Sequence, residues 1–281
     1  MRSAIGIDIG GTKIRAAWVS ESGEILAESV QPTATPALAV VSQIEAMAGA
    51  LHAPARAALG IGVPGRVDAA AGIVLSGGIV DLSGKTIRWG GRPAFIDNDA
   101  NMALLAEARL GAAKGLAHAV MLTIGTGIGG AVLDQGRILR GRAAAGQLGH
   151  ITVDLNGGLC LCGRRGCVET ASSGTALGRL MAAAGLPSST EAGELVERGD
   201  AVSRAVIEAW ARPLRAAIDN LVAAFDPQCV ILGGGLGRAA CAALARFPSA
   251  APWFQFPVIP ATLGGSAGVI GAALIALEQA A

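Results

Sequence analysis

One pattern occurs twice in this chain, about 115 residues apart. The stretches IDIGGTKIRAAWV at 7–19 and LTIGTGIGGAVL at 122–133 are each typical of a strand, a glycine- and threonine-containing turn and a second strand. A further apolar strand follows each hairpin, SGEIL in the first case and QGRIL in the second. Glycine-rich hairpins also resemble one another by chance, but a true repeat predicts two related α/β halves. These halves would face each other, and each would offer one glycine turn to a shared cleft.

Other apolar runs and the residues that bound them predict the remaining elements and the domains. We expect buried strands at 59–63, 95–96, 119–124 and 229–232, and helices at 37–51, 101–110, 175–184, 192–197, 203–224 and 268–278. The terminal helix is expected to return to the first half. We therefore predict an N-terminal α/β domain of residues 1–112 plus 266–281 and a C-terminal α/β domain of residues 113–265, which carries a cysteine-rich loop at 150–167.

The composition argues against several classes of protein. Hydrophobic residues make up 52% and charged residues 15% of the 281 residues, which is typical of a folded chain. The net charge of +1 gives no reason to expect a nucleic acid or an acidic membrane as partner. The N-terminus lacks the pattern of a secretory signal, and no apolar run reaches the ~20 residues of a membrane-spanning helix. We expect a soluble cytoplasmic protein, in which cysteines are usually reduced.

Three glycine turns, each after an apolar strand, are candidate phosphate-binding sites, because glycine lets backbone N–H groups approach an anion closely. The first is not a P-loop, since Lys13 follows Thr12 and a strand stands where a P-loop requires a helix. A single glycine turn is more often structural, so the prediction depends on the occurrence of three. The candidate residues are Gly10, Gly11, Thr12 and Lys13, then Gly125, Thr126 and Gly127, and finally Gly233, Gly234 and Gly235.

Two aspartates are candidates for charge-dependent roles. Asp8 interrupts the apolar strand AIGIDIG, and an unpaired buried carboxylate is costly. We therefore expect a cation, a water or phosphate-bound Mg²⁺ beside it, unless it caps its own turn. Asp99 lies in FIDNDAN, where Asp97, Asn98 and Asp99 are all suitable helix N-caps and one of them is expected to cap. The functional alternative is that Asp99 accepts a proton from a substrate hydroxyl, as aspartates do in kinases.

Four soft ligands gather in one loop with the spacing H-x9-C-x-C-x4-C, formed by His150, Cys160, Cys162 and Cys167. Three cysteines and one histidine match a closed tetrahedral Zn²⁺ site, which is structural because it leaves no position for a reactive water. A disulfide would need an oxidising compartment and would leave one cysteine over, and a single reactive thiol is the third alternative. Glu169 follows closely; it is either a plain surface residue or a ligand contact fixed in place by the loop.

Taken together, these motifs resemble those of the ROK family of bacterial sugar kinases over nearly the whole chain. The resemblance depends on IDIGGTK at 7–13, GVPGRVD at 62–68, NDAN at 98–101, TIGTGIGG at 123–130, GQLGH at 146–150, CLCGRRGCVE at 160–169 and ILGGG at 231–235. It implies a two-domain, actin-like (ribonuclease H-like) α/β fold with an interdomain cleft. It also implies ATP and Mg²⁺, transfer to the 6-hydroxyl of a hexose, and a homodimer.

The resemblance also implies roles for individual residues. Asp99 resembles the general base, and Asp8 and the first two glycine turns resemble the surface for phosphates and Mg²⁺. Gly233 and Gly234 resemble the adenosine contact. The residues that resemble sugar ligands are Gly65, Asn98, Gln147, His150 and Glu169, with His150 also holding zinc through one ring nitrogen.

The chain departs from the family pattern at Gln147, where the family usually has a glutamate in E-x-G-H. A neutral amide bonds a plain hydroxyl less strongly than a carboxylate does, but it carries donors that suit the carbonyl of an N-acetyl group. Glucose and N-acetylmannosamine therefore both remain candidates.

A DNA-binding regulator is disfavoured, because the first hairpin begins by residue 6 and no basic recognition helix follows. A catalytically weak or inactive sugar-binding protein is the remaining alternative.

Overall fold

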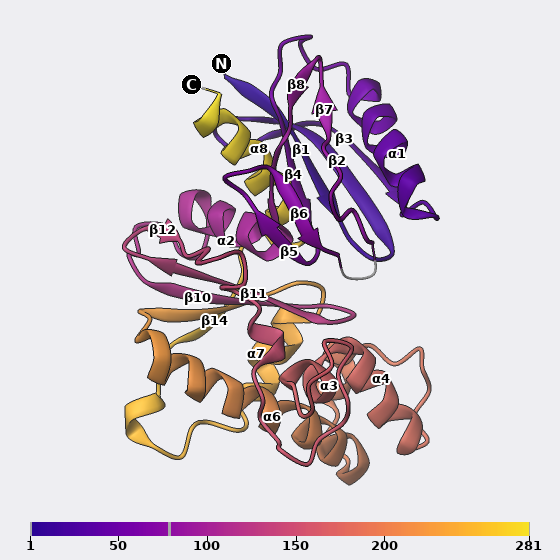
Figure 1. Cartoon of the computed structure of the whole chain (residues 1–281). Helices are drawn as coiled ribbons and strands as arrows, with labels where there is room; N and C mark the ends of the chain where they lie inside the picture. The colour runs from indigo at the N-terminus through magenta and orange to yellow at the C-terminus, as the bar shows by residue number, and fades with distance from the viewer. Residues whose placement is uncertain (1, 78–79, 281) are drawn as a thin grey trace. The chain divides into compact units, whose positions relative to one another are not determined.

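The structure is a computed structural model that describes residues 2–77 and 80–280. The chain divides into two compact units, which can be followed by colour in Figure 1. Unit 1 contains Met1–Gly115, Ile138–Ala145 and Ser266–Ala281, and unit 2 contains Leu116–Arg137 and Gly146–Gly265. The sequence analysis placed residues 138–145 in the second domain, whereas they pack with unit 1.

Unit 1 is built on a five-stranded mixed sheet in the order β3-β2-β1-β4-β9. The central strand β1 pairs antiparallel with β2 and parallel with β4, and β4 pairs parallel with β9. The strands are β1 (Ser3–Ile9), β2 (Lys13–Ser20), β3 (Ile25–Pro32), β4 (Leu59–Val63) and β9 (Phe95–Asn98). Side chains alternate along β1, so Ile5, Ile7 and Ile9 join the core that also contains residues of α1 (Ala37–Ala50).

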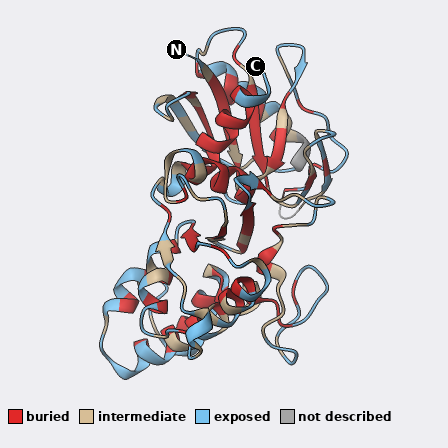
Figure 2. Ribbon diagram, turned by 90° about the vertical axis from the view of Figure 1, so that its left-hand side faces the viewer, coloured by how far each residue is buried: buried red, intermediate tan, exposed pale blue. Residues whose placement is uncertain are grey.

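The other face of this sheet is covered by the terminal helix α8 (Ala267–Gln279), as predicted. Glycines in the strands let the helix backbone come very close. A Cβ added at Gly6 would lie 1.9 Å from the carbonyl oxygen of Val269, and one at Gly60 would lie 1.7 Å from that of Ala272. Helix α2 (Asp99–Leu110) packs in turn against α8. Figure 2 shows buried residues concentrated in the central strands of unit 1 and in α8.

Unit 2 repeats this topology, with the strand order β12-β11-β10-β13-β14. Its central strand β10 pairs antiparallel with β11 and parallel with β13. The strands are β10 (Ala119–Ile124), β11 (Ile128–Asp134), β12 (Arg137–Ile138), β13 (Cys229–Gly233) and β14 (Val258–Pro260). The pairs Ile9–Ile14 and Ile124–Ile128 close the two equivalent hairpins. The prediction of two halves with related strand order is therefore confirmed.

The helices of unit 2 are α3 (Val168–Ser172), α4 (Gly174–Ala183), α5 (Ala192–Glu197), α6 (Ala201–Phe225) and α7 (Gly237–Leu244). The sequence analysis missed α3 and α7, which are short. It also missed the small strands β5 (Arg66–Asp68), β6 (Ile73–Ser76), β7 (Arg88–Trp89) and β8 (Arg92–Pro93), and the 3₁₀ turns η1 (Leu148–His150), η2 (Pro252–Phe254) and η3 (Gly264–Ser266). Among the residues that the structure describes, none of the helices has both the length and the apolar character needed to cross a bilayer.

Candidate functional site

In unit 1, the predicted carboxylates Asp8 and Asp99 lie on either side of Gly62. Asp8 pairs with Gly62 across the parallel strands β1 and β4. A Cβ at Gly62 would lie 3.3 Å from the Cα atom of Asp99 and 3.6 Å from Oδ1 of Asp8. Residue 62 therefore has to be small for the two carboxyl groups to share this end of the sheet.

Burial makes both carboxyl groups weak acids. Burial, and after it the neighbouring charge of Asp8, raise the pKa of Asp99 to about 7 in spite of hydrogen bonds that lower it. Burial likewise raises the pKa of Asp8 to about 6, although Arg15 and Lys13 oppose this effect. Both residues keep some solvent exposure. A half-buried aspartate whose pKa lies near neutrality is suited to accept a proton, and a pair of such acids favours a nearby cation.

The turn between β9 and α2 shows which residue caps the helix. Oδ1 of Asn98 accepts hydrogen bonds from the backbone N–H groups of Ala100 (3.0 Å) and Asn101 (3.3 Å). The amide of Asn98 also donates to the carbonyl oxygen of Gly65 at 3.0 Å, so two predicted sugar ligands lie together. Because Asn98 caps α2, Asp99 is the first helical residue, and its Oδ1 accepts a hydrogen bond from the N–H of Ala100 (2.9 Å).

The helix α8 begins beside Asp8, which the sequence analysis did not foresee. A Cβ at Gly268 would lie 2.7 Å from the carboxyl carbon of Asp8. The first turn of α8 therefore contacts this carboxylate directly, and the positive end of the helix faces it. Arg15 donates a hydrogen bond from Nη1 to Oγ of Ser266 (2.7 Å), the residue before the helix. The first glycine turn is closed by a hydrogen bond from the Gly10 N–H to the carbonyl oxygen of Lys13 (2.9 Å).

In unit 2, the second and third glycine turns lie next to each other. The N–H of Leu236, just after the third turn, donates to the carbonyl oxygen of Ile124 at 3.0 Å. Gly234 has a φ of 75°, and a Cβ there would lie 2.4 Å from the same oxygen. The start of helix α4 joins them, because the N–H of Gly174 donates to the carbonyl oxygen of Gly125 at 2.8 Å. The sequence analysis missed Gly174, whose only signal was the helix-capping Ser173 before it.

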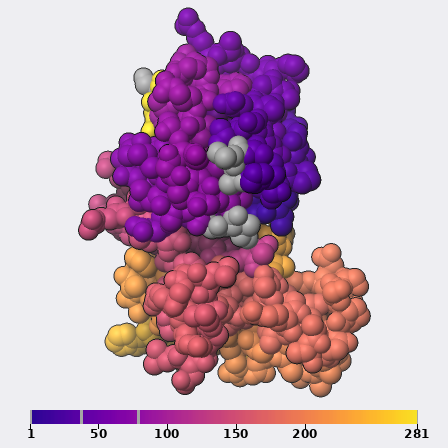
Figure 3. Space-filling view, turned by 45° about the vertical axis from the view of Figure 1, so that its right-hand side comes forward, coloured from indigo at the N-terminus to yellow at the C-terminus, as the bar shows by residue number. Residues whose placement is uncertain are grey.

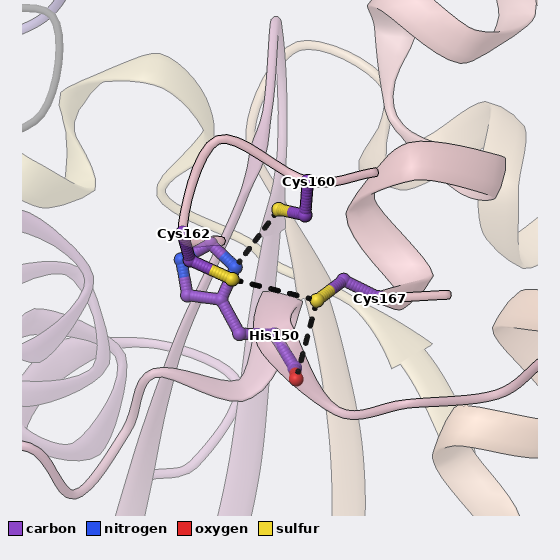
Figure 4. Close-up of side chains that lie close together, drawn as sticks. All are labelled: His150, Cys160, Cys162 and Cys167. Carbon is purple, nitrogen blue, oxygen red and sulfur yellow. Dashed lines mark hydrogen bonds between the residues drawn. The ribbon is translucent and has the colours of Figure 1, made fainter. Parts of the chain in front are cut away.

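The four predicted zinc ligands come together in unit 2 (Figure 4), in a loop whose side chains reach the surface shown in Figure 3. Their candidate ligand atoms lie within 4.8 Å of one another. Nδ1 of His150 is 3.5 Å from Sγ of Cys160, and Sγ of Cys162 is 3.6 Å from Sγ of Cys167. Tetrahedral zinc with ordinary bond lengths requires about 3.5 Å between nitrogen and sulfur and about 3.8 Å between sulfurs. The residues therefore fit a zinc ion.

The chemistry of the cysteines agrees with this fit. Burial raises the pKa of Cys167 to about 12, so without a cation its thiol stays protonated. A bound metal reverses this preference, because thiolates are its ligands. Backbone hydrogen bonds hold the loop closed, from the Cys160 N–H to the carbonyl oxygen of Arg164 (2.8 Å) and from the Gly163 N–H to that of Cys160 (2.9 Å). The site is closed by four protein ligands and is therefore structural.

Glu169 links the zinc loop to the second glycine turn. One carboxylate oxygen accepts a hydrogen bond from the N–H of Ile128 at 2.8 Å, and the other is 3.9 Å from Sγ of Cys160. A Cβ at Gly127 would lie 2.4 Å from Oε2 of Glu169, so a larger residue there would displace this carboxylate. Glu169 thus contacts both the second glycine turn and the zinc loop. Gln147 precedes the 3₁₀ turn η1, and its carbonyl oxygen accepts from the N–H of His150 (3.1 Å).

A duplicated α/β fold in which each half presents a glycine hairpin, with half-buried carboxylates in one half, is typical of the actin-like sugar kinases. Comparison with known proteins gives the particular family: the chain belongs to the ROK family, whose model matches residues 4–279.

Named relatives fall into two substrate groups. The chain is 32% identical to a glucokinase of Thermotoga maritima, over 98% of this chain and 97% of the relative. It is 33% identical to an N-acetylmannosamine kinase of Shigella boydii, over 98% of both chains. Among solved structures, it is similar to a ROK family glucokinase from Streptomyces griseus in complex with glucose and AMPPNP, with a TM-score of 0.83, 31% identity and coverage of 98% of this chain and 99% of the other. The predicted family and fold class are confirmed.

Proposed function

We propose that this protein transfers the terminal phosphoryl group of ATP to the 6-hydroxyl of a hexose or N-acetylhexosamine. The observation that carries the proposal is Asp99, a half-buried carboxyl group with a pKa of about 7, beside Asp8 at one end of the sheet. A base with such a pKa is ionised often enough at neutral pH to accept a hydroxyl proton, and basic enough to hold it. Named kinases of two sugars among the relatives support the same reaction.

In the proposed reaction, Asp99 removes the proton of the sugar 6-hydroxyl as its oxygen bonds to the γ-phosphorus. The bond between that phosphorus and the bridging oxygen breaks, and ADP leaves. Bound ATP supplies the phosphoryl group. Asp8 would hold Mg²⁺, which would supply positive charge to neutralise the phosphates. The backbone donors of Gly10 to Lys13 and Gly125 to Gly127 are proposed to bind phosphate oxygens, and Gly233 and Gly234 to contact the adenosine.

The proposed sugar ligands are Gly65, Asn98, Gln147, His150 and Glu169. His150 faces Cys160 through Nδ1, which leaves Nε2 as a donor or acceptor for a sugar hydroxyl. Zinc bound by this histidine and the three cysteines would fix the tautomer and hold the loop that carries Glu169. It would take no part in phosphoryl transfer, because no coordination position stays open.

The identity of the sugar depends on Gln147 in this proposal. Its amide can donate to the carbonyl of an N-acetyl group, which favours N-acetylmannosamine, whereas a carboxylate at this position would favour a free 2-hydroxyl. The two groups of named relatives leave glucose as an equal candidate. We further propose that the two units are the two domains of the enzyme, that the enzyme is a homodimer, and that it is cytoplasmic.

A panel of sugars tests the function directly. The purified protein is incubated with Mg²⁺–ATP and glucose, mannose, N-acetylglucosamine or N-acetylmannosamine, and ADP release is measured by a coupled assay. We expect turnover of glucose or N-acetylmannosamine, with the phosphate at the 6-position. Sugar-independent ADP release, or no turnover with any sugar, would refute the proposal and favour an inactive sugar-binding protein.

A further inference from the structure

An ion pair between a buried aspartate and a partly exposed arginine, beside the proposed base, has no role in the reaction described above. The side chain of Asp97 is 4% exposed, and its Oδ2 accepts a hydrogen bond from Nε of Arg140 at 2.8 Å. Its other oxygen accepts from the backbone N–H of Asn98 (2.7 Å) and from Nδ2 of Asn101 (2.9 Å). Both oxygens of this carboxylate are therefore occupied, and its negative charge is balanced by one arginine.

Asp97 controls the geometry of the turn that carries the proposed base. It hydrogen-bonds the residue that caps α2, Asn98, and a residue in the first turn of the same helix, Asn101. Asp99 lies between these two contacts in the chain. A displacement of the Asp97 side chain would therefore reach Asp99 through one turn of backbone. Active-site geometry is sensitive to such shifts, since a misplacement of about 1 Å can cost roughly 100-fold in rate.

Arg140 comes from a segment with an unusual position in the chain. Residues 138–145 pack with unit 1, although the chain before and after them belongs to unit 2. Side-chain hydrogen bonds fasten this segment, from Arg140 to Asp97 and from Nε of Arg66 to the carbonyl oxygen of Ala143 (3.4 Å). The chain then runs directly into Gln147. The ion pair therefore anchors the stretch that leads to one set of proposed sugar ligands onto the turn that carries another.

We propose that Arg140 is a positioning residue for the reaction: through Asp97 it fixes the turn that carries Asn98 and Asp99, and it anchors the segment that leads to Gln147. This inference rests on the proposed function. If Arg140 is removed, Asp97 is left as a buried carboxylate without its balancing charge, which is strongly unfavourable. The turn would then rearrange to bring Asp97 to water, and the proposed base and cap would move with it. Arg140 touches no substrate in this account and acts only through Asp97.

Kinetics of matched arginine variants test the role. Arg140→Met removes the charge and keeps much of the apolar stem, and Arg140→Lys keeps the charge but not the guanidinium. Arg142→Gln is the control, because Arg142 is exposed in the same segment and makes no polar contact within residues 2–77 and 80–280. We expect kcat/KM for the sugar to fall about 10- to 100-fold in Arg140→Met, with the KM for ATP within about twofold of wild type. The kcat/KM of Arg140→Lys should lie between those of Arg140→Met and wild type, and the kcat/KM of Arg142→Gln should equal that of wild type.

A purely structural role predicts a different result. The melting temperature of Arg140→Met would then be lower than that of wild type. Its kcat/KM for the sugar, measured well below that temperature, would nevertheless equal that of Arg142→Gln. This outcome would overturn the inference. Should Arg140→Met not fold, Arg140→Lys carries the same comparison. Hydrogen–deuterium exchange of the peptide covering 95–110 supplies a readout without turnover, and faster exchange is expected in Arg140→Met only. If wild type phosphorylates no sugar, the proposed function fails, while unchanged exchange in this peptide independently refutes the positioning role.

Discussion

The pH dependence of the reaction follows from the environment of Asp99. Burial and the nearby charge of Asp8 raise its pKa from 3.8 to about 7. A base must be ionised to accept a proton, so the rate should fall as the pH drops below about 7. At pH 6 only about one tenth of Asp99 would be ionised, whereas an aspartate with an ordinary pKa would be almost fully ionised there. We therefore expect kcat/KM for the sugar to fall about tenfold per pH unit below pH 7.

The contribution of Asp99 to folding stability should change with pH in the direction opposite to the rate: it increases as the pH falls. Because the pKa of Asp99 is higher in the folded protein than in the unfolded chain, the folded state binds its proton more tightly. This contribution to stability is fully present below about pH 4 and is lost as the pH rises through about 7. Loss of activity between pH 7 and pH 6 therefore cannot come from unfolding caused by this group. Asp99→Asn, which stays neutral, should be more stable than wild type at pH 8, by about 1–4 kcal/mol.

The assay measures kcat/KM for the sugar at saturating Mg²⁺–ATP from pH 5.5 to 9, for wild type, Asp99→Asn and Glu45→Gln. Glu45 is exposed on α1 and serves as the control carboxylate. Asp99→Asn should lose about 10²- to 10⁴-fold in kcat and retain no acid limb in its residual rate. Near-normal turnover of Asp99→Asn, or a wild-type rate that stays constant down to pH 5.5, would refute the assignment of Asp99 as a base with a raised pKa.

Three further perturbations test other parts of the molecule. Elemental analysis should find about one zinc per chain in wild type and much less in Cys162→Ser, whose melting temperature should fall by about 5 °C or more; a zinc-free wild type with normal activity would contradict the site. Gly6→Ala should cost about 2–3 kcal/mol in chemical denaturation, since its Cβ would lie 1.9 Å from the carbonyl oxygen of Val269. Gly49→Ala, which meets open space in a helix, should instead gain up to about 1 kcal/mol, and equal effects of the two changes would show that close packing is not the cause. Gln147→Glu should raise the ratio of kcat/KM for glucose to that for N-acetylmannosamine by about tenfold, and an unchanged ratio would exclude residue 147 as the discriminating contact.

Local patterns in the sequence were sufficient to predict the two hairpins and the metal cluster. The apolar runs of β1 and β10 and the glycine turns after them predict the strands and their hairpin partners. The ligand spacing from His150 to Cys167 likewise depends on one loop, whose chemistry is carried by residue type. Asp97, Asn98 and Asp99 were recognised as capping candidates, but the sequence could not say which of the three caps. The identity of the capping residue depends on tertiary contacts. Asn98 also donates a hydrogen bond to Gly65, and Asp97 forms an ion pair with Arg140.

Contacts between distant segments explain most of what the sequence did not predict. Gly268 reads as an ordinary helix residue until the helix is placed on the sheet, where its missing side chain makes room for the carboxylate of Asp8. Arg140 is one of many arginines in the sequence, and its importance depends on the packing of residues 138–145 with unit 1. Neither contact produces a periodic or local pattern in the sequence, because each joins residues that are far apart in the chain. The order of residues within one segment therefore cannot predict it.

The two hairpins have the same topology but differ in chemistry at an equivalent position. Counting back from the closing pairs Ile9–Ile14 and Ile124–Ile128, Asp8 of the first hairpin corresponds to Thr123 of the second. Asp8 pairs across the strands with Arg15, whereas Thr123 pairs with Gly129, so unit 1 has a carboxylate and a cation where unit 2 has neutral residues. A second carboxylate at Thr123 would add negative charge near polyphosphate oxygens without a cation to balance it. In the proposed reaction, the repeated fold supplies two sets of backbone donors, and the difference at this one position confines the metal-binding charge to the unit that also carries the base.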